Sequence, residues 1–392
     1  MEKEVFMPWK VSNPMNERMK FVIRHEQGEK MTDLCREFGI SRKTGYKFLK
    51  RFKVFGPAGL FDEARRPIIK ARKTPKSIEN LIVEFKMQYQ TWGARKLIAG
   101  LKQKYPGVKF PVHSTVSAIL KRYDLVKKRK RYKKPPRYNG SLTTAKQPND
   151  VWCADFKGQF RMGNFNYCYP LTISDEYSRY LISCEGLENT RTIGARGVFE
   201  VAFKRYGLPK VIRTDNGAPF ATRGVGGLSK LSVWWRRLGI KVERIEPGHP
   251  EQNGRHERMH LTLKQEATRP AGYNLLNQQE KLDKFVEEYN NVRPHEALEM
   301  QSPAKVYRMS NRRYPVLLPE LDYSLHDFVR RVKSCGKLAL TGKNRDFYFG
   351  RALTGEKVGI REMEERRWLI SFMDVDLGHY DENTSIFTPI NH

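Results

Sequence analysis

The chain of 392 residues carries 73 Lys and Arg against 43 Asp and Glu, so its formal net charge is +30 at pH 7. This length predicts two to four domains, at about 100–200 residues per domain. No run of about 18 apolar residues occurs, and the first residues lack the apolar stretch of a secretory signal. We therefore expect a cytoplasmic protein with no membrane-spanning segment. The excess positive charge calls for an anionic partner, and nucleic acid, an anionic membrane and an acidic protein are the alternatives.

Residues 1–70 are predicted to form an all-α helix-turn-helix domain. Apolar residues recur at helical spacing in two stretches, Gly39 then breaks the pattern, and Ser41 is placed to cap a third helix. That helix would bury Tyr46, Phe48, Leu49 and Phe52. Its outward side, the side that reads a major groove in this motif, would carry Arg42, Lys43, Thr44, Lys47, Lys50 and Arg51. The alternative is a small helical bundle with an ordinary solvated basic face.

Two further segments follow before the character of the chain changes. Residues 75–125 repeat the helical pattern and predict a second helix-turn-helix or a winged helix, with a cap at residues 113–115. Residues 126–147 are predicted to be a basic linker, because ten of the 17 positions from 121 to 137 are Lys or Arg. A run of this kind is a solvated tail or follows a phosphate backbone, and its place between two domains favours the second. Its expected DNA contacts are Lys127, Lys128, Arg129, Lys130 and Arg131.

Residues 148–308 are predicted to form a mixed sheet with covering helices. Three strand-like stretches come first, and helix-like and strand-like stretches then alternate. The helices are expected at 192–206 and 228–238, and the strands at 151–156, 167–173, 180–185, 210–213 and 240–245. Residues 320–392 are expected to contain short strands around 338–340, 347–349, 358–360 and 368–372, separated by glycines and turn residues, which predicts a small β-barrel.

Two aspartates stand at strand ends in this basic chain. Asp155 ends the first predicted strand, and Asp215 ends another, immediately before an Asn-Gly turn. Ligands gather outside the strand ends of such sheets, so neighbouring strands would bring the two carboxylates together. Hard oxygen ligands with open coordination positions suit Mg²⁺ or Mn²⁺ shared with a substrate phosphate.

A third carboxylate is expected on the helix predicted from Arg255 onward. Glu257 lies near its start, and His260 and Lys264 follow on the same helix face, three and seven residues later. This spacing places a lysine for phosphate beside a carboxylate for metal. Three other glutamates are rival third ligands, with the last of them rated well below Glu257: Glu243, Glu246 and Glu251.

These motifs together resemble the signatures of DDE transposases and retroviral integrases. They are Trp152-Cys153-Ala154-Asp155, Thr214-Asp215-Asn216-Gly217 and the stretch from His249 to Glu257, followed by Lys264. Downstream, Tyr289-Asn290, Arg293-Pro294-His295 and Ser302-Pro303-Ala304 resemble the tail of bacterial insertion-sequence transposases. The resemblance spans about residues 150–308. Two departures are an interval from Asp215 to Glu257 longer than in familiar integrases, with the excess expected in the glycine-rich 221–227 loop, and an amino terminus without integrase zinc ligands.

The resemblance implies an α/β RNase H-like fold with a mixed five-stranded sheet. The small barrel expected after it from the strand pattern is of the SH3-like kind. It implies that Asp155, Asp215 and Glu257 form a metal-binding catalytic triad and that Lys264 contacts DNA. The expected function is binding of the terminal inverted repeats of an insertion sequence, with metal-dependent strand cleavage and strand transfer. We expect two Mg²⁺ ions about 3.5–4 Å apart, and a homodimer or higher homo-oligomer on double-stranded element ends and target DNA at the bacterial nucleoid. No small-molecule substrate is expected.

Two alternatives stay open. The chain could be a sequence-specific DNA-binding protein or repressor whose RNase H-like domain is inactive. More remotely, His256-Glu257-Arg258-Met259-His260 reads H-E-x-x-H, the helix of zinc proteases. The protease hypothesis explains neither Asp155, nor Asp215, nor the excess charge.

Overall fold

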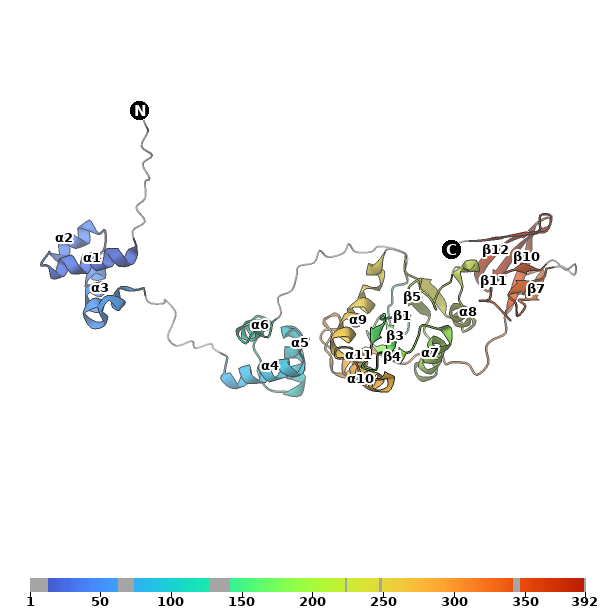
Figure 1. Ribbon diagram of the computed structural model, residues 1–392, viewed down its shortest axis with the longest axis horizontal. Coiled ribbons are helices and arrows are strands. Elements are labelled where there is room, and N and C mark those ends of the chain that lie inside the picture. Colours follow the sequence, from blue (N-terminus) through green and yellow to red (C-terminus); the bar gives the residue numbers. More distant parts are fainter. Residues whose placement is uncertain are drawn as a thin grey trace, which may run out of the picture. The chain divides into compact units, whose positions relative to one another are not determined.

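The computed structural model describes residues 13–62, 74–126, 142–222, 224–246, 249–340 and 346–390, with the backbone alone at residues 250 and 251. The chain divides into two compact units, Met1–Lys73 and Thr74–His392 (Figure 1). Within the described ranges, no helix has both the length and the apolar character needed to cross a bilayer. The five basic residues expected to contact DNA from the linker, at 127–131, lie outside these ranges.

The first unit contains a helix-turn-helix. Helices α1 (Pro14–Glu26), α2 (Met31–Glu37) and α3 (Arg42–Phe55) pack around Phe21, Leu34 and Leu49, and a short 3-10 helix, η1 (Gly56–Leu60), follows. The expected cap is present, since the Ser41 hydroxyl accepts the Thr44 N–H at 3.2 Å. The prediction that Tyr46 is buried is wrong, because the inward face of α3 runs through Gly45 and Leu49 and leaves Tyr46 57% exposed.

Gly45 lets α3 lie unusually close to the other two helices. A Cβ atom at this position would come within 2.8–2.9 Å of Met31 Sδ, Cys35 Sγ and the Phe21 ring. We expect Gly45→Val to destabilise the domain by about 1–3 kcal/mol, the usual cost of overpacking a core. The measurement is thermal unfolding followed by circular dichroism, with Tyr46→Val on the exposed side as the matched control. Equal unfolding temperatures for the two variants would contradict this close packing.

Three helices open the second unit. Helices α4 (Lys76–Gln88), α5 (Ala94–Lys104) and α6 (His113–Arg122) enclose a small core that includes Trp92, Leu97 and Val116. The cap expected at residues 113–115 is wrong. The helix already begins at His113, after an extended Val112, and no side chain caps its first turn.

The central sheet is mixed, as predicted. Its five main strands are β1 (Val151–Phe156), β3 (Tyr167–Asp175), β4 (Leu181–Leu187), β5 (Val211–Thr214) and β6 (Lys241–Arg244). They lie in the order β4-β3-β1-β5-β6, in which β3 is antiparallel to β4 and β1, and β1, β5 and β6 are parallel. The prediction of five strands lacked a sixth, the two-residue β2 (Phe160–Arg161), which pairs with the start of β3. It runs in the same direction as β1 along their shared antiparallel partner β3, after an interruption that includes Gly158, whose φ of 83° suits glycine.

Helices cover both faces of this sheet (Figure 1). Trp152 and Ala154 of β1 pack with α7 (Thr192–Tyr206) and α8 (Lys230–Arg237) on one face. On the other face, Leu181 and Cys184 of β4 pack with α9 (Gly254–Glu266) and α10 (Leu275–Glu287). Since successive side chains of a strand alternate between faces, Asp155 lies on the face opposite Ala154, where α9 packs.

Short elements complete the helical side of this domain. They are η3 (Pro250–Asn253) before α9, and η4 (Glu288–Val292), η5 (Glu296–Leu298) and α11 (Pro303–Val306) after α10. The π-helical η4 continues directly from α10 and places Asn290 against the outer edge of β4. This stretch holds the tail motifs that the sequence singled out.

The carboxy-terminal region is rich in β-structure. Strands β7 (Phe328–Arg331), β10 (Lys357–Glu364), β11 (Arg367–Phe372), β12 (Val375–Asp381) and β13 (Ile386–Pro389) form an antiparallel sheet in the order β13-β12-β11-β10-β7. Strands β8 (Lys337–Leu338) and β9 (Phe347–Tyr348) form a separate pair. Among the described strands no pairing joins β13 to β7, so the expected closed barrel is not confirmed.

The glycine-rich loop at 221–227, where the excess residues between Asp215 and Glu257 are expected, packs against this carboxy-terminal sheet. Its 3-10 turn, η2 (Val225–Gly227), lies against β12, and Leu228 and Val233 join the apolar core of the carboxy-terminal strands. At Gly226 a Cβ would come within 3.0 Å of the Leu377 side chain. This loop therefore joins the catalytic domain to the core of the carboxy-terminal strands.

Candidate active site

The mixed sheet brings Asp155 and Asp215 to the same edge. Strands β1 and β5 are adjacent and parallel, with Cys153 in register with Arg213. Asp155 therefore lies at the carboxyl end of β1, and Asp215 directly follows the end of β5. The Asp215 Oδ1 atom accepts the Gly217 N–H at 3.1 Å, so the Asn-Gly turn fixes how this carboxylate leaves the strand.

Glu257 enters from the first turn of α9 and is exposed. The start of this helix is held in place by an ion pair of 2.6 Å between Arg255 Nη1 and Glu176 Oε1. A carboxylate in the first turn is also stabilised by the positive end of the helix dipole. The sequence therefore favours a helix that begins where Glu257 faces the strand ends.

The three carboxylates act on one another electrostatically. Burial, together with the nearby Asp215 and Glu257 carboxylates, raises the pKa of Asp155 to about 7, and burial also raises the pKa of Asp215. The three do not converge into a tight cage, since the described residues contain no group of three His, Cys, Asp or Glu close enough to hold a metal ion. A divalent cation would relieve the repulsion at Asp155, and three hard oxygen donors with open positions suit Mg²⁺. The donor set therefore fits the metal that the sequence predicted.

The rival third ligands are placed differently from Glu257. Glu243 is buried on β6, where its carboxylate accepts hydrogen bonds from Arg213 Nη2 at 3.1 Å and from the Thr143 N–H at 3.2 Å. These bonds lower the pKa of Glu243 although burial opposes them. Glu246 has its main-chain N–H bonded to Gln252 Oε1 at 2.8 Å, and the side chain of Glu251 lies outside the described atoms.

Cationic side chains near this site act on one another. Lys264 is exposed on α9. Burial and the nearby Lys264 and Arg269 lower the pKa of Lys157, and Lys157 in turn helps lower that of His260. Sequence reasoning missed Lys157, although its place two residues after Asp155 puts it on the same face of the chain.

A network of buried hydrogen bonds lies next to Asp155. The hydroxyl of Thr172, on β3 directly opposite Asp155, lies 2.7 Å from the Nε2 atoms of both His256 and His260 and 3.0 Å from the Asp155 carbonyl oxygen. Burial lowers the pKa of His260 to about 3, with a further contribution from Lys157, so the ring is neutral. The approach of 3.8 Å between His260 Nδ1 and Asp155 Oδ2 is therefore not an ion pair.

The same network argues against the zinc-protease hypothesis. In the H-E-x-x-H helix both histidines must direct a nitrogen to one metal ion. Here the two Nε2 atoms converge on the Thr172 hydroxyl, which occupies the place such an ion would need, and His256 Nδ1 is bonded to Ser174 Oγ at 2.8 Å.

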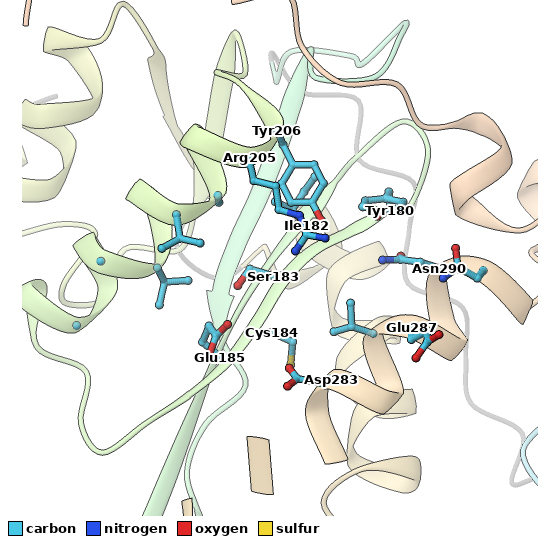
Figure 2. A pocket seen from close by; sticks show the side chains of 17 residues that line it. Tyr180, Ile182, Ser183, Cys184, Glu185, Arg205, Tyr206, Asp283, Glu287 and Asn290 are labelled. Carbon is cyan, nitrogen blue, oxygen red and sulfur yellow. The ribbon is translucent and has the colours of Figure 1, made fainter. Parts of the chain in front are cut away.

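A hollow with a volume of about 700 Å³ lies between β4, α7 and α10, and none of the three carboxylates lines it. Figure 2 shows the side chains that line this hollow. Asn290 closes the edge of β4 beside it, accepting the Leu181 N–H at 2.8 Å and donating to the Leu181 carbonyl at 2.9 Å. Gln279 bonds the same edge farther along, at Gly186 and Cys184. These two side chains bond main-chain N–H and C=O groups at the free edge of β4, which would otherwise lack a partner. Their role here is to stabilise the fold.

The expected reader helix presents most of its basic residues to solvent. Arg42, Lys43, Lys47 and Lys50 are exposed on α3, whereas Thr44 is half-buried and bonded to the Ser41 hydroxyl at 2.9 Å. Arg51 is half-buried as well, and its Nη2 donates to the Phe61 carbonyl at 2.7 Å. Arg51 therefore braces α3 against the segment that follows it.

Comparison with known families agrees with this geometry. Residues 145–250 and 238–303 match models described as "Integrase core domain". Residues 17–68 match a "Helix-turn-helix domain", and residues 44–120 match a "Homeodomain-like domain". The mixed sheet and its helices are thus an integrase core, preceded by a DNA-binding helix-turn-helix.

Individual relatives are similar over different extents. The "Insertion element IS476 uncharacterized 39.2 kDa protein" of Xanthomonas euvesicatoria is 26% identical over 255 residues, which cover 63% of this chain and 69% of the relative. The Gag-Pol polyprotein of baboon endogenous virus (strain M7) is 31% identical over 130 residues, 33% of this chain and 7% of the polyprotein. The integrase core, the helix-turn-helix and these relatives together support an insertion-sequence transposase of the DDE and retroviral-integrase superfamily.

Solved structures of retroviral integrases are more distant in sequence. The HTLV-2 integrase catalytic core domain in complex with magnesium (trimeric form) has 16% identity and a TM-score of 0.34, covering 42% of this chain and all of that one. A simian T-cell lymphotropic virus intasome in complex with PP2A regulatory subunit B56 gamma has 15% identity and a TM-score of 0.36, covering 78% of this chain and 95% of that one.

Proposed function

We propose that this transposase binds the terminal inverted repeats of its insertion sequence, cleaves the DNA strands there and joins them to target DNA. Asp155, Asp215 and Glu257 are the proposed catalytic residues. The observation that carries the proposal is the placement of Asp155 and Asp215 at the carboxyl ends of the adjacent parallel strands β1 and β5, with Glu257 in the first turn of α9. Burial and the repulsion from Asp215 and Glu257 also raise the pKa of Asp155, which agrees with this placement. Repulsion among these carboxylates destabilises the protein when no ligand is bound, and a bound cation would relieve it.

The same three carboxylates are the proposed ligands of Mg²⁺, or of Mn²⁺, with two ions per site. Bound there, the metal would supply charge neutralisation at the scissile phosphate and lower the pKa of the attacking hydroxyl or water. The protein holds Asp155 and Asp215 at strand ends and Glu257 in the first turn of α9. Lys157 and Lys264, which act on each other electrostatically, are the proposed partners of phosphate groups. Positioning and charge account for most of such a reaction, so no protein nucleophile is required.

DNA binding is proposed for three parts of the chain: the basic face of α3, the linker residues Lys127–Arg131 and Lys264. The exposed Arg42, Lys43, Lys47 and Lys50 share one helix of a helix-turn-helix, which gives this helix the role of reading the major groove. Thr44 and Arg51 keep a place in the proposal as flanking residues, although both have partners within the protein.

Replacing Lys43 and Lys47 together with Ala is expected to weaken binding of the terminal repeats. Each lost phosphate contact should lower the slope of log affinity against log salt by about 0.9, and a lost base contact should cost about 1–3 kcal/mol. Fluorescence anisotropy with a labelled repeat duplex at several salt concentrations measures both quantities. Lys20→Ala together with Lys53→Ala, on exposed positions of α1 and at the end of α3, is the matched control. Equal salt slopes in both double variants would contradict the role of α3.

Several coarser features fit this proposal. Two element ends must be joined in one event, so a homodimer or larger homo-oligomer is the proposed active form on DNA. The proposed domains are residues 1–70, 75–125, 148–308 and 320–392, with a linker at 126–147. An SH3-like barrel is proposed for the last of these, since its two sheets share one apolar core that includes Leu338, Phe349 and Ile370. The nucleoid of a bacterial cell is the proposed location.

A repressor with an inactive core is the second candidate, favoured by the absence of a preformed three-carboxylate cage in the described residues. An assay with a labelled duplex that carries the inverted repeats flanking the gene separates the two. A transposase is expected to shift the duplex and, with Mg²⁺ but not with EDTA, to release a cleaved strand. A shifted duplex that stays intact with Mg²⁺ and with Mn²⁺ would favour the repressor.

A further inference from the structure

The Thr172 hydroxyl joins the elements that carry two of the proposed catalytic carboxylates. Thr172 is fully buried on β3, in register with Asp155 on β1. Its hydroxyl contacts the main-chain carbonyl of Asp155 at 3.0 Å. It also contacts the Nε2 atoms of two histidines of α9 at 2.7 Å each, and these histidines lie one residue before and three residues after Glu257.

The hydrogen atoms in this network have one consistent arrangement. A carbonyl oxygen only accepts, so the single hydroxyl hydrogen of Thr172 is donated to Asp155. Both imidazoles must then donate from Nε2 to the two lone pairs of the Thr172 oxygen. Each neutral ring consequently has an unprotonated Nδ1 atom. In His256 that atom accepts from the Ser174 hydroxyl at 2.8 Å, which completes the network.

The lone pair on Nδ1 of His260 determines how this ring acts on Asp155. The Nδ1 atom of His260 lies 3.8 Å from Asp155 Oδ2, and as an acceptor it has no hydrogen to donate to that carboxylate. Asp155 is thus left without a hydrogen bond from its nearest imidazole. Its carboxylate accepts a hydrogen bond from the main chain of Phe156, and the other oxygen lone pairs stay available for a cation.

We infer that Thr172 is a positioning residue of the proposed reaction: it holds His260 as the Nε2–H tautomer, keeps Asp155 unblocked, and fixes the helix that carries Glu257 against the strand that carries Asp155. The catalytic part of this inference, that Thr172 positions groups for the reaction, rests on the proposed function. The hydrogen-bond arrangement itself does not depend on activity.

Removal of the hydroxyl should change the tautomer. In Thr172→Val the Nε2–H of His260 loses its acceptor, and a proton on Nδ1 would instead find Asp155 Oδ2 as a partner. That new hydrogen bond would compete with a cation for the same oxygen. Loss of a group that supports a metal ligand typically costs 10–100-fold in metal affinity or activity.

The first test reads the tautomers directly. The full chain is labelled with ¹⁵N-histidine, and the ring nitrogens are observed by NMR in metal-free buffer, with the His260 signals assigned by their loss in His260→Gln. We expect Nε2–H and unprotonated Nδ1 for both His256 and His260 in the wild type and in Thr172→Ser, which keeps the hydroxyl. An Nδ1–H signal for His260 in the wild type would overturn the inference without any variant at position 172.

The second test compares Thr172→Val with Thr172→Ser, after circular dichroism has established that both are folded. Mn²⁺ is titrated into each labelled protein and the broadening of the His260 signals is followed. We expect the half-saturating Mn²⁺ concentration to rise about tenfold in Thr172→Val and to stay within about twofold of the wild type in Thr172→Ser. Equal values in the two variants would overturn the inference, as would a rise of the same size in Thr172→Ser.

Strand cleavage serves as the separate readout of the proposed function. We expect Thr172→Val to recover cleavage at raised Mg²⁺, because the carboxylates remain, while binding of the repeat duplex stays unchanged. A wild type that shows the expected tautomers and Mn²⁺ response but never cleaves DNA would contradict the proposed function and leave the positioning role of Thr172 standing. Cleavage by a wild type whose His260 carries its proton on Nδ1 would support the proposed function and overturn the positioning role of Thr172.

Discussion

Replacing Asp155 or Asp215 with Asn is expected to abolish DNA cleavage and strand transfer, by more than about a hundredfold, the upper range for loss of a supporting metal group. Each substitution keeps the shape of the side chain and removes the negative charge that a cation and a developing phosphate charge would use. Binding of the terminal repeats should stay within about twofold, since the proposed phosphate contacts lie largely on other elements.

The measurement is a time course of cleaved and joined products with a labelled repeat duplex and Mg²⁺, beside a band-shift titration. Glu280→Gln is the matched control, because it removes one negative charge from an exposed position of α10. Strand transfer retained in either Asp variant would remove that residue from the catalytic assignment. Loss of duplex binding together with activity would point to misfolding, which the unfolding temperature checks.

Glu243→Gln is expected to destabilise the catalytic domain by about 3 kcal/mol, the low end for breaking a buried ion pair. Arg213 and Glu243 are only 5% and 8% exposed, and their carboxylate–guanidinium contact is 3.1 Å. The substitution leaves the Arg213 charge buried without its counter-charge. The measurement is urea unfolding followed by tryptophan fluorescence, with Glu280→Gln as the control.

The pH dependence of this effect has a definite sign. The pKa of folded Glu243 is lowered by the bonds from Thr143 and Arg213, which outweigh the effect of burial. The stability from this group is therefore present above the unfolded pKa of about 4.3 and is lost as the pH falls through the folded value. The difference between wild type and Glu243→Gln should narrow in acid. A difference that is constant from pH 7 to pH 3 would contradict the ion pair, and a loss of activity without a loss of stability would return Glu243 to the list of metal ligands.

Much of the catalytic domain could be predicted because its signals are local. The α7 helix was predicted at its observed bounds, Thr192–Tyr206, since its apolar pattern ends at a Gly-Leu-Pro turn. Strand β1 was also predicted at its observed bounds. Asp155 and Asp215 were chosen as candidate metal ligands because they stand at strand ends. The sequence did not show that these two strands are neighbours. The fold shows it, because β1 pairs with β5 in parallel.

The supporting side chains depend on pairing between distant segments and were therefore hidden. Thr172 gains its meaning only from its register with Asp155, 17 residues earlier, and from α9, 84 and 88 residues later. Nothing in a stretch of β-forming residues distinguishes this threonine from any other. The two histidines of the H-E-x-x-H motif misled in the other direction. Their local pattern indicates a zinc site, whereas in the fold both rings contact the Thr172 hydroxyl.

The carboxy-terminal region was harder for a different reason. Strands β7 and β13 are mostly exposed and have no alternation of apolar and polar residues, so periodicity could not find them. In β12 the alternation is interrupted where its pairing with β11 shifts near Ser371. The contacts of Leu228 and Val233 with this region likewise required the fold.

The most direct test of the metal-dependent site replaces one non-bridging oxygen of the scissile phosphate with sulfur. Mn²⁺ accepts sulfur ligands more readily than Mg²⁺, so a metal that contacts this oxygen should reveal itself by a change of preference. We expect the wild type to cleave one phosphorothioate diastereomer at least about tenfold more slowly than the normal duplex in Mg²⁺, and to recover most of that loss in Mn²⁺. Equal cleavage of the normal duplex and of both diastereomers in Mg²⁺, or cleavage that persists in EDTA, would contradict a site in which Asp155, Asp215 and Glu257 hold the metal against the phosphate.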